Sequence, residues 1–175
     1  ICPLLVATGF TLAPPATAAA KASDGATFND PLVGSKRYAL TRHVRALIKR
    51  TPGASSRAAG ATIHVAMYTY SSAERKTVDA LVRAARRGVN VRLLLDSDKT
   101  LEPGYRRYAS FFRGLQKKYP TFKVSFCPIG RGCIGNAHPD SNNHNKFFLF
   151  SRTDGTDRVV VQSSANLTRA NSVSY

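Results

Sequence analysis

The sequence predicts a mixed α/β fold in which a mixed central sheet is flanked by helices, and three observations support that prediction. An apolar strand, a helix and a second apolar strand occupy residues 63–95, about the length of a parallel crossover. Two further apolar runs near the carboxyl end are joined by residues typical of a hairpin turn. The composition, 43% hydrophobic and 21% charged, is that of a globular protein and excludes a disordered tail.

The first expected helix covers residues 35–50 and ends at Pro52-Gly53. Its apolar residues repeat at helical spacing: Leu40, Val44, Leu47 and Ile48. A short, largely apolar strand follows over residues 63–69.

A second helix is expected after Ser71-Ser72-Ala73-Glu74, because these residues have the S-x-x-E form of a capping box. One face of this helix is apolar: Val78, Leu81, Val82 and Ala85. Arg86-Arg87-Gly88 suits its carboxyl end. A buried strand over residues 89–95 completes the unit and is followed by Asp96.

The remaining elements are a third helix, three strands and a long loop. The helix is marked by the spacing of four residues: Tyr105, Tyr108, Phe112 and Leu115. Residues 122–126 alternate as in a strand with one buried face, and residues 128–143 are expected to form a loop. Strands at 147–150 and 159–161 flank a turn at 153–156.

The chain carries a large positive charge. Twenty-six Lys and Arg residues stand against 10 Asp and Glu, a formal net charge of +16. Such an excess favours anionic partners, namely nucleic acid, anionic lipid headgroups or another polyphosphate surface, without choosing among them. No apolar run reaches the roughly 18 residues that a membrane span needs.

Residues 1–20 are uncharged and are interpreted as the remnant of a secretory signal peptide. An apolar stretch is followed by small residues, and Ala18-Ala19-Ala20 fits a cleavage site. We therefore expect a secreted, extracellular protein whose given sequence is a fragment. Residues 21–34 are expected to be a flexible lead-in, and residues 35–175 to form the folded domain, truncated at its carboxyl end.

Two cysteines remain once Cys2 leaves with the signal peptide. Cys127 and Cys133 bracket a short Gly-rich loop, and an even number in an exported chain predicts a disulfide. A zinc site would need two further ligands, and the nearby His138 and Asp140 match no familiar spacing. We expect no metal and no cofactor.

The segment richest in reactive groups is Asn142-Asn143-His144-Asn145-Lys146. Side chains two apart on an extended segment project from the same face, so His144 and Lys146 can point into one pocket. An imidazole can attack phosphorus, and an ammonium can neutralise the charge that builds on the non-bridging oxygens. Ser164 and Asn166, just past the next strand, could hydrogen-bond the same oxygens. The alternative is an ordinary strand start with a solvated lysine.

The order H-x-K, apolar strand, turn, apolar strand and then S-S-A-N resembles the phospholipase D superfamily, whose signature is H-x-K-x4-D followed by G-S-x-N. The earlier segment ending in RRGVNVRLLLD is also similar to that family's opening strand–helix–strand unit. The resemblance covers residues 35–170 and implies the first phospholipase D-like lobe of a secreted bacterial-type protein. Two positions depart from the signature: Ser151 stands at its aspartate and Ser163 at its glycine.

The resemblance implies a metal-free phosphodiesterase. His144 attacks phosphorus to form a phosphohistidine, and Lys146 stabilises the developing charge. Ser164 and Asn166 hold the phosphate oxygens, and a second histidine from a twin motif protonates the leaving alcohol. That second motif comes from another lobe of the same chain or from a homodimer partner. The departure at Ser151 leaves the aspartate's role unassigned.

The leading expectation is a phospholipase D-type enzyme that hydrolyses phospholipid headgroup phosphodiester bonds and contacts a membrane peripherally. The alternatives are a secreted nuclease of the same superfamily, with nucleic acid as its partner, and a non-catalytic anion-binding module. His43, His64 and His138 lack a partner lysine and are assigned structural roles. Tyr68 and Tyr70 stand at the carboxyl end of the first strand. Packing is their expected role, and lining the pocket is the alternative.

Overall fold

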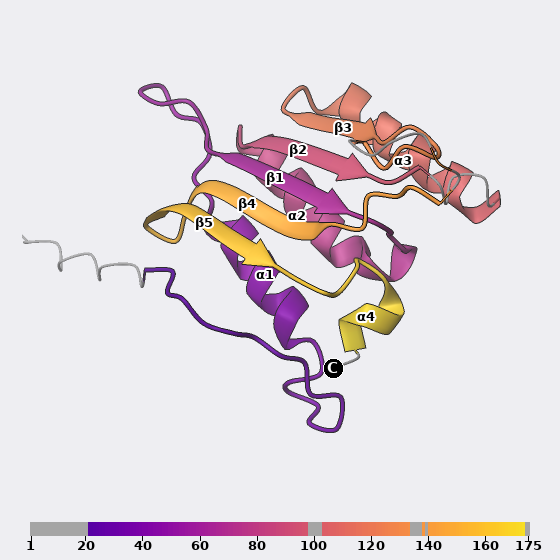
Figure 1. The fold of residues 1–175 in the computed structure, drawn as a ribbon. Coiled ribbons are helices and arrows are strands. Elements are labelled where there is room, and N and C mark those ends of the chain that lie inside the picture. Colours follow the sequence, from indigo (N-terminus) through magenta and orange to yellow (C-terminus); the bar gives the residue numbers. More distant parts are fainter. Residues whose placement is uncertain (1–20, 98–102, 134–137, 139, 174–175) are drawn as a thin grey trace, which may run out of the picture.

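The computed structural model describes residues 21–97, 103–133, 138 and 140–173 (Figure 1). The expected signal-peptide remnant, including Cys2, lies outside the described residues. The helices and strands, in chain order, are α1 (Ala39–Arg50), β1 (Thr62–Met67), the 3-10 turn η1 (Ser72–Glu74), α2 (Arg75–Arg86), β2 (Asn90–Leu95), α3 (Pro103–Lys118), β3 (Phe122–Phe126), β4 (Lys146–Thr153), β5 (Thr156–Gln162) and α4 (Arg169–Val173).

The five strands form one mixed sheet in the order β3-β2-β1-β4-β5 (Figure 1). Strands β1, β2 and β3 are parallel to one another, as the crossover unit predicts. Strand β4 runs antiparallel to β1, and β5 antiparallel to β4. The carboxyl ends of β1, β2 and β3 therefore lie at the same edge of the sheet as the amino end of β4.

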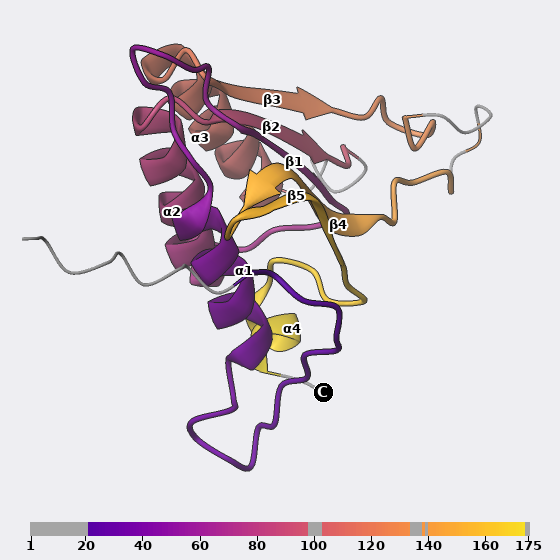
Figure 2. The same ribbon diagram turned by 90° about the vertical axis from the view of Figure 1, so that its left-hand side faces the viewer.

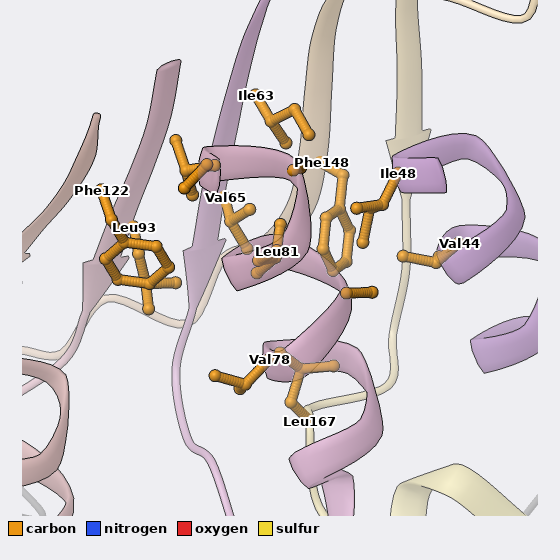
Figure 3. Close-up of a cluster of buried hydrophobic side chains, with 14 of the residues drawn as sticks. Val44, Ile48, Ile63, Val65, Val78, Leu81, Leu93, Phe122, Phe148 and Leu167 are labelled. Carbon is orange, nitrogen blue, oxygen red and sulfur yellow. The ribbon is translucent and has the colours of Figure 1, made fainter. Parts of the chain in front are cut away.

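Helices α1, α2 and α3 lie on one side of the sheet (Figure 2). Their apolar side chains meet the inward face of the strands in a single core (Figure 3). The labelled members of this core are Val44, Ile48, Ile63, Val65, Val78, Leu81, Leu93, Phe122, Phe148 and Leu167. The α/β prediction is confirmed. No helix in the described part of the chain has both the length and the apolarity that a membrane span requires.

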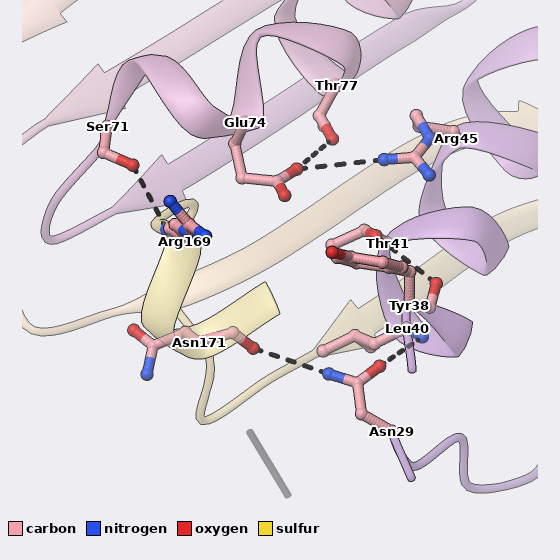
Figure 4. Close-up of polar contacts among 10 residues, drawn as sticks. All are labelled: Asn29, Tyr38, Leu40, Thr41, Arg45, Ser71, Glu74, Thr77, Arg169 and Asn171. Atoms are coloured by element: carbon pink, nitrogen blue, oxygen red, sulfur yellow. Dashed lines mark hydrogen bonds and ion pairs between the residues drawn. The ribbon is translucent and has the colours of Figure 1, made fainter. Parts of the chain in front are cut away.

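Helix α1 starts at Ala39, four residues later than the apolar spacing predicted. The preceding residues form turns instead of helix, because the Asp30 carboxylate accepts the backbone N–H groups of Leu32 and Val33. Asn29 then caps the helix from outside it, since its Oδ1 accepts the Leu40 N–H at 3.0 Å (Figure 4). Asn29 is only 6% exposed, although it lies in the segment expected to be a flexible lead-in.

The predicted capping box is wrong. Ser71 makes no side-chain cap to the turn that follows it, because its hydroxyl accepts the backbone N–H of Arg169 at 3.2 Å (Figure 4). Glu74 is buried and binds Thr77 Oγ1 at 2.8 Å and the guanidinium of Arg45 at 3.8 Å. Both side chains thus serve contacts with α4 and α1 that the local spacing does not reveal.

The carboxyl end of α2 falls at Arg86, as predicted. Gly88 follows with φ +85°, a conformation that favours glycine. Arg87 donates to the carbonyl oxygens of Ile48 and Lys49, each at 3.2 Å, and so also caps the last turn of α1.

The predicted hairpin between β4 and β5 is confirmed. Asp154 and Gly155 occupy the turn with φ values of 51° and 70°, as expected of the tight turns that match strand twist. The hairpin places the end of β5 beside the start of β4, since Phe147 pairs with Gln162.

Candidate active site

The sequence-predicted site residues gather at the sheet edge where β1 ends and β4 begins. Lys146, the first residue of β4, pairs with Met67, the last residue of β1. The backbone N–H of Ser163, just past β5, donates to the Lys146 carbonyl at 2.9 Å. The H-x-K segment and the turn that carries Ser164 and Asn166 therefore meet at one edge.

Lys146 is buried, with only 4% of its surface exposed. Its ammonium donates to the carbonyl oxygen of His144 at 2.6 Å and lies 5.6 Å from the centre of the Tyr68 ring. This burial lowers the pKa of Lys146, because desolvation disfavours the charged form. An ammonium held in this way is a fixed positive charge of the kind that stabilises a developing anion.

His144 is exposed, and its ring packs against the same tyrosine. The ring centres of His144 and Tyr68 lie 4.9 Å apart with the planes tilted by 59°. The imidazole and the ammonium thus contact one aromatic ring. Both groups therefore lie beside the Tyr68 ring, although His144 precedes β4 and only Lys146 belongs to the strand.

Tyr68 is the residue of this site that the sequence reasoning assigned to the core. It is half-buried and contacts both His144 and Lys146. Its place directly after β1, at the carboxyl edge of a parallel sheet, is the feature that made pocket lining the alternative for this residue. Tyr70 does pack in the core, at 3% exposure, and burial raises its pKa to about 12.

A carboxylate fixes the backbone that carries His144. Asp96 follows β2, is 2% exposed, and accepts the backbone N–H of Asn143. The side-chain oxygen of Asn143 in turn accepts the side-chain amide of Asn145 at 2.8 Å. The hydrogen bond between Asp96 and Asn143 joins residues 47 positions apart in sequence, so no local sequence pattern indicates it.

Asn166 lies against the residue that follows Tyr68. Its Oδ1 accepts the Thr69 N–H at 3.2 Å, and its own N–H donates to Asn171 Oδ1 at 3.1 Å. Ser164 is exposed, and none of the hydrogen bonds described joins it to His144 or Lys146. The structure thus brings Asn166 to the Tyr68 edge and leaves Ser164 open to solvent.

Ser163 occupies the glycine position of the family signature without strain. Its φ is not among the positive values of the described residues, so this position does not require glycine. Its hydroxyl accepts the Ala165 N–H at 2.9 Å and closes the turn before Asn166.

No described acidic residue takes the place of the signature aspartate at Ser151. The Ser151 hydroxyl accepts the Thr62 N–H at 2.8 Å, at the start of β1. Asp154 lies in the turn after β4 and pairs with Arg50 at 2.8 Å, while Asp157 pairs with Arg152 at 3.5 Å. Both acids are at the opposite end of β4 from Lys146.

The other three histidines are all exposed: His43, His64 and His138. The structural roles expected of these three histidines therefore do not consist of packing in the core. His138 pairs with Asp140 at 3.7 Å in the loop before the site.

Cys127 and Cys133 form a disulfide, as predicted, and close the Gly-rich turn that follows β3. Within the described residues, no group of three or more His, Cys, Asp or Glu side chains is arranged to hold a metal ion.

Comparison with known proteins gives a family-model match and matches to solved structures. The family model described as "Cardiolipin synthase, PLD-like domain" matches residues 56–174. Among solved structures, the fold is similar to that of Nuc, a phospholipase D family member from Salmonella typhimurium, with a TM-score of 0.51 and 16% sequence identity. That match covers 78% of this chain and 70% of Nuc. No curated protein matches the sequence.

Proposed function

The chain belongs to the phospholipase D-like domain family, a superfamily of phosphodiesterases, and on that premise we propose that it hydrolyses the headgroup phosphodiester bond of phospholipids through a phosphohistidine intermediate. His144 is the nucleophile in this proposal and Lys146 its electrostatic partner. Asn166 and Ser164 hold the phosphate oxygens.

The observation that carries the proposal is the contact of His144 and Lys146 with one ring, that of Tyr68. An exposed imidazole beside a buried ammonium is the arrangement that nucleophilic attack on an anionic diester needs. The nucleophile remains accessible, while the cation is fixed where negative charge develops.

The proposed chemistry has two steps. An imidazole nitrogen of His144 bonds to phosphorus, the bond to the leaving alcohol breaks, and a second histidine gives that alcohol its proton. Water then attacks the phosphohistidine, the phosphorus–nitrogen bond breaks, and the second histidine takes up the proton of the water. Lys146 stays protonated throughout and stabilises the charge on the non-bridging oxygens.

The second histidine is proposed to come from another H-x-K motif, carried by a second lobe of the same chain or by a homodimer partner. The three other histidines of this sequence lack a lysine two positions on. None of them is therefore proposed for this role.

A nuclease activity is the second candidate, because the net charge of +16 suits a phosphate backbone. A third hypothesis is a module that binds anions without turnover, and the replacement of the signature aspartate by Ser151 supports it. The three readings differ in what the protein does to its ligand.

Assays of the full-length protein for lipid hydrolysis, DNA cleavage and anion binding distinguish the three hypotheses. We expect choline release from phosphatidylcholine vesicles, no nicking of plasmid DNA, and loss of choline release in His144→Ala with an unchanged far-UV circular dichroism spectrum. His43→Ala is the matched control, because His43 is an exposed histidine of α1. Nicking without choline release would establish the nuclease, and salt-dependent anion binding without turnover would establish the binding module.

Export to the extracellular space is also proposed. The uncharged residues 1–20 support it, and so does the Cys127–Cys133 disulfide, since disulfides persist in oxidising compartments. Finding the chain cleaved near Lys21 in the culture medium is the expected result, and an uncleaved protein confined to the cytoplasm would contradict it.

A further inference from the structure

An apolar loop over residues 28–38 projects from the molecule before α1 (Figures 1 and 2). Four large apolar side chains on it face solvent: Phe28 is 76% exposed, Leu32 86%, and Val33 and Tyr38 41% each. These four form what we call the apolar tip. Single exposed apolar residues are common, but four within eleven positions mark an interaction surface.

The loop is held in this shape by its own hydrogen bonds. The Asp30 carboxylate accepts the N–H of Leu32 at 3.0 Å and that of Val33 at 3.3 Å. The Asp30 N–H donates to the Lys36 carbonyl at 3.2 Å, and the Lys36 N–H to the Val33 carbonyl at 2.7 Å. The turn therefore keeps Leu32 and Val33 exposed in a defined conformation, without a collapse onto the core.

Positive charge surrounds the apolar tip. Lys36, Arg37 and Arg42 are all exposed, and Asp30 is the single acid in residues 28–42. Three basic groups against one acid give this stretch a charge of +2. Apolar side chains next to Lys and Arg are the composition of segments that bind the interface of anionic membranes. A nucleic acid would use the charges and leave the apolar tip in water.

The base of the loop is hydrogen-bonded to α4 (Figure 4). Asn29 caps α1 through Leu40, and its amide donates to the carbonyl of Asn171 at 3.5 Å. The Asn171 side chain accepts the backbone N–H of Asn166 at 3.1 Å. The base of the loop is therefore linked through Asn171 to the turn that carries the proposed phosphate-binding Asn166.

We propose that the 28–38 loop is an interfacial anchor: its apolar tip inserts into a bilayer of anionic phospholipids while Lys36, Arg37 and Arg42 contact the headgroups. The role of the anchor rests on the proposed function, because the anchor would serve to bring Asn166 and His144 to their lipid substrate. The binding itself is measured independently of turnover.

The first experiment measures sedimentation of the full-length protein with two kinds of vesicle: phosphatidylcholine alone, and phosphatidylcholine mixed with anionic phosphatidylglycerol. We expect binding to the anionic vesicles, weakened about a hundredfold in Leu32→Ser/Val33→Ser, since inserting each of the two side chains is worth about tenfold. The control is Leu149→Ser/Val160→Ser, because these two are exposed apolar residues of the sheet, 36% and 62% exposed. The control should bind like the wild type.

The second variant, Lys36→Gln/Arg37→Gln, tests the charges. We expect about thirtyfold weaker binding to the anionic vesicles and a smaller salt dependence, at about fivefold per basic group. Lys117→Gln/Lys118→Gln, an adjacent exposed pair at the end of α3, is the matched control and should bind normally.

Equal binding by the wild type and both loop variants, or equal losses in loop and control variants, would overturn the anchor. So would a change in oligomeric state of Leu32→Ser/Val33→Ser in light scattering without vesicles, because the apolar tip would then join protein copies. Turnover of soluble bis(p-nitrophenyl) phosphate separates the two proposals. The loop variants should still hydrolyse this soluble diester. If the wild type does not hydrolyse it, the proposed phosphodiesterase function is contradicted, whereas the proposed membrane anchor is not.

Discussion

At the scale of single residues, the unusual group is Lys146, a lysine that is 4% exposed and has no acidic partner among its described contacts. Lysine is rarely buried to this degree unless it is paired, because the charged form loses its hydration. Its contacts are the His144 carbonyl and the Tyr68 ring, both of which are weaker partners than a carboxylate. A buried lysine without a carboxylate partner costs stability and marks a candidate functional site.

Replacing this lysine by an apolar residue of similar shape should therefore separate activity from stability. For Lys146→Met we expect turnover to fall by roughly 2.7–4 kcal/mol of transition-state stabilisation, with a melting temperature equal to or above that of the wild type. Steady-state kinetics and thermal unfolding measure the two. Lys49→Met, at an exposed position of α1, is the control. A change in KM alone would make Lys146 a docking residue.

The pH dependence follows from the lowered pKa of Lys146. Between its folded and unfolded pKa values the unfolded chain binds more protons, so the free energy of unfolding should rise with pH through that window. Activity should fall over the same window, because the ammonium is lost. Urea unfolding and kcat/KM measured in parallel test this, and Lys146→Met should lack the rise in stability. A wild type whose activity stays constant there would contradict the role of the charge.

Tyr68 should act as a positioning residue through its ring. We expect Tyr68→Phe to retain activity, and Tyr68→Leu to lower kcat/KM about tenfold, since a cation–π contact is worth about 0.5–2 kcal/mol. The effect should fall on kcat, because the ring orients groups that act in the transition state. Tyr119→Leu is the matched control, since Lys118 lies 5.7 Å from the Tyr119 ring. Equal losses for Phe and Leu at position 68 would shift the role to the hydroxyl group.

Two tyrosines show which features of the site could not be predicted from the sequence. The spacing of His144 and Lys146 predicted that both side chains serve one pocket, and both lie beside the Tyr68 ring although His144 precedes β4. Tyr68 and Tyr70 have the same spacing, yet one contacts the site and the other is buried in the core. Their residue type gives no distinction. Only the position of the strand end relative to β4 separates them.

At the scale of elements, the site depends on a contact between the end of β2 and the segment that enters β4. Asp96 accepts the Asn143 N–H and thereby fixes the backbone next to His144. Hydrogen bonds to a charged group of this kind contribute about 1.5–3 kcal/mol. The carboxylate therefore holds in place the backbone next to His144, the proposed nucleophile.

We expect Asp96→Ala to accelerate amide hydrogen exchange over residues 141–147 and to lower kcat more than it raises KM. Asp96→Asn should restore much of the protection, because its side-chain oxygen still accepts a hydrogen bond. Asp79→Ala is the control, since Asp79 forms an exposed i,i+4 pair with Arg75. Unchanged exchange over 141–147 in Asp96→Ala would show that the segment is held by other contacts.

Most helices and strands were predictable because the spacing of apolar residues along the sequence determines where they form. Strands β1 to β5 and helices α2 and α3 lie where apolar spacing places them. The capping box failed and α1 starts late for a shared reason: the polar side chains that end helices bind partners far away in sequence. Asn29 and Leu40 are 11 positions apart, and Ser71 and Arg169 are 98 apart.

At the scale of the whole molecule, strand order explains why segments 20 to 100 positions apart build one site. Parallel β1 and β2 place Tyr68 and Asp96 at one edge, and antiparallel β4 starts there with Lys146. The hairpin returns the chain to that edge and delivers Asn166. Of the residues in the family signature, the structure brings His144, Lys146 and Asn166 to this edge, and the topology adds Tyr68 and Asp96, which the signature does not include.

The central claim is that the His144 imidazole attacks phosphorus, and trapping the covalent intermediate tests it most directly. Full-length protein turning over a short-chain phosphatidylcholine is quenched in alkali, where phosphohistidine survives, and its peptides are mapped by mass spectrometry. The account predicts a phosphatidyl adduct on His144, absent in His144→Ala and present in His43→Ala. An adduct on another residue, or turnover with no adduct in a wild type quenched on the millisecond scale, would contradict it.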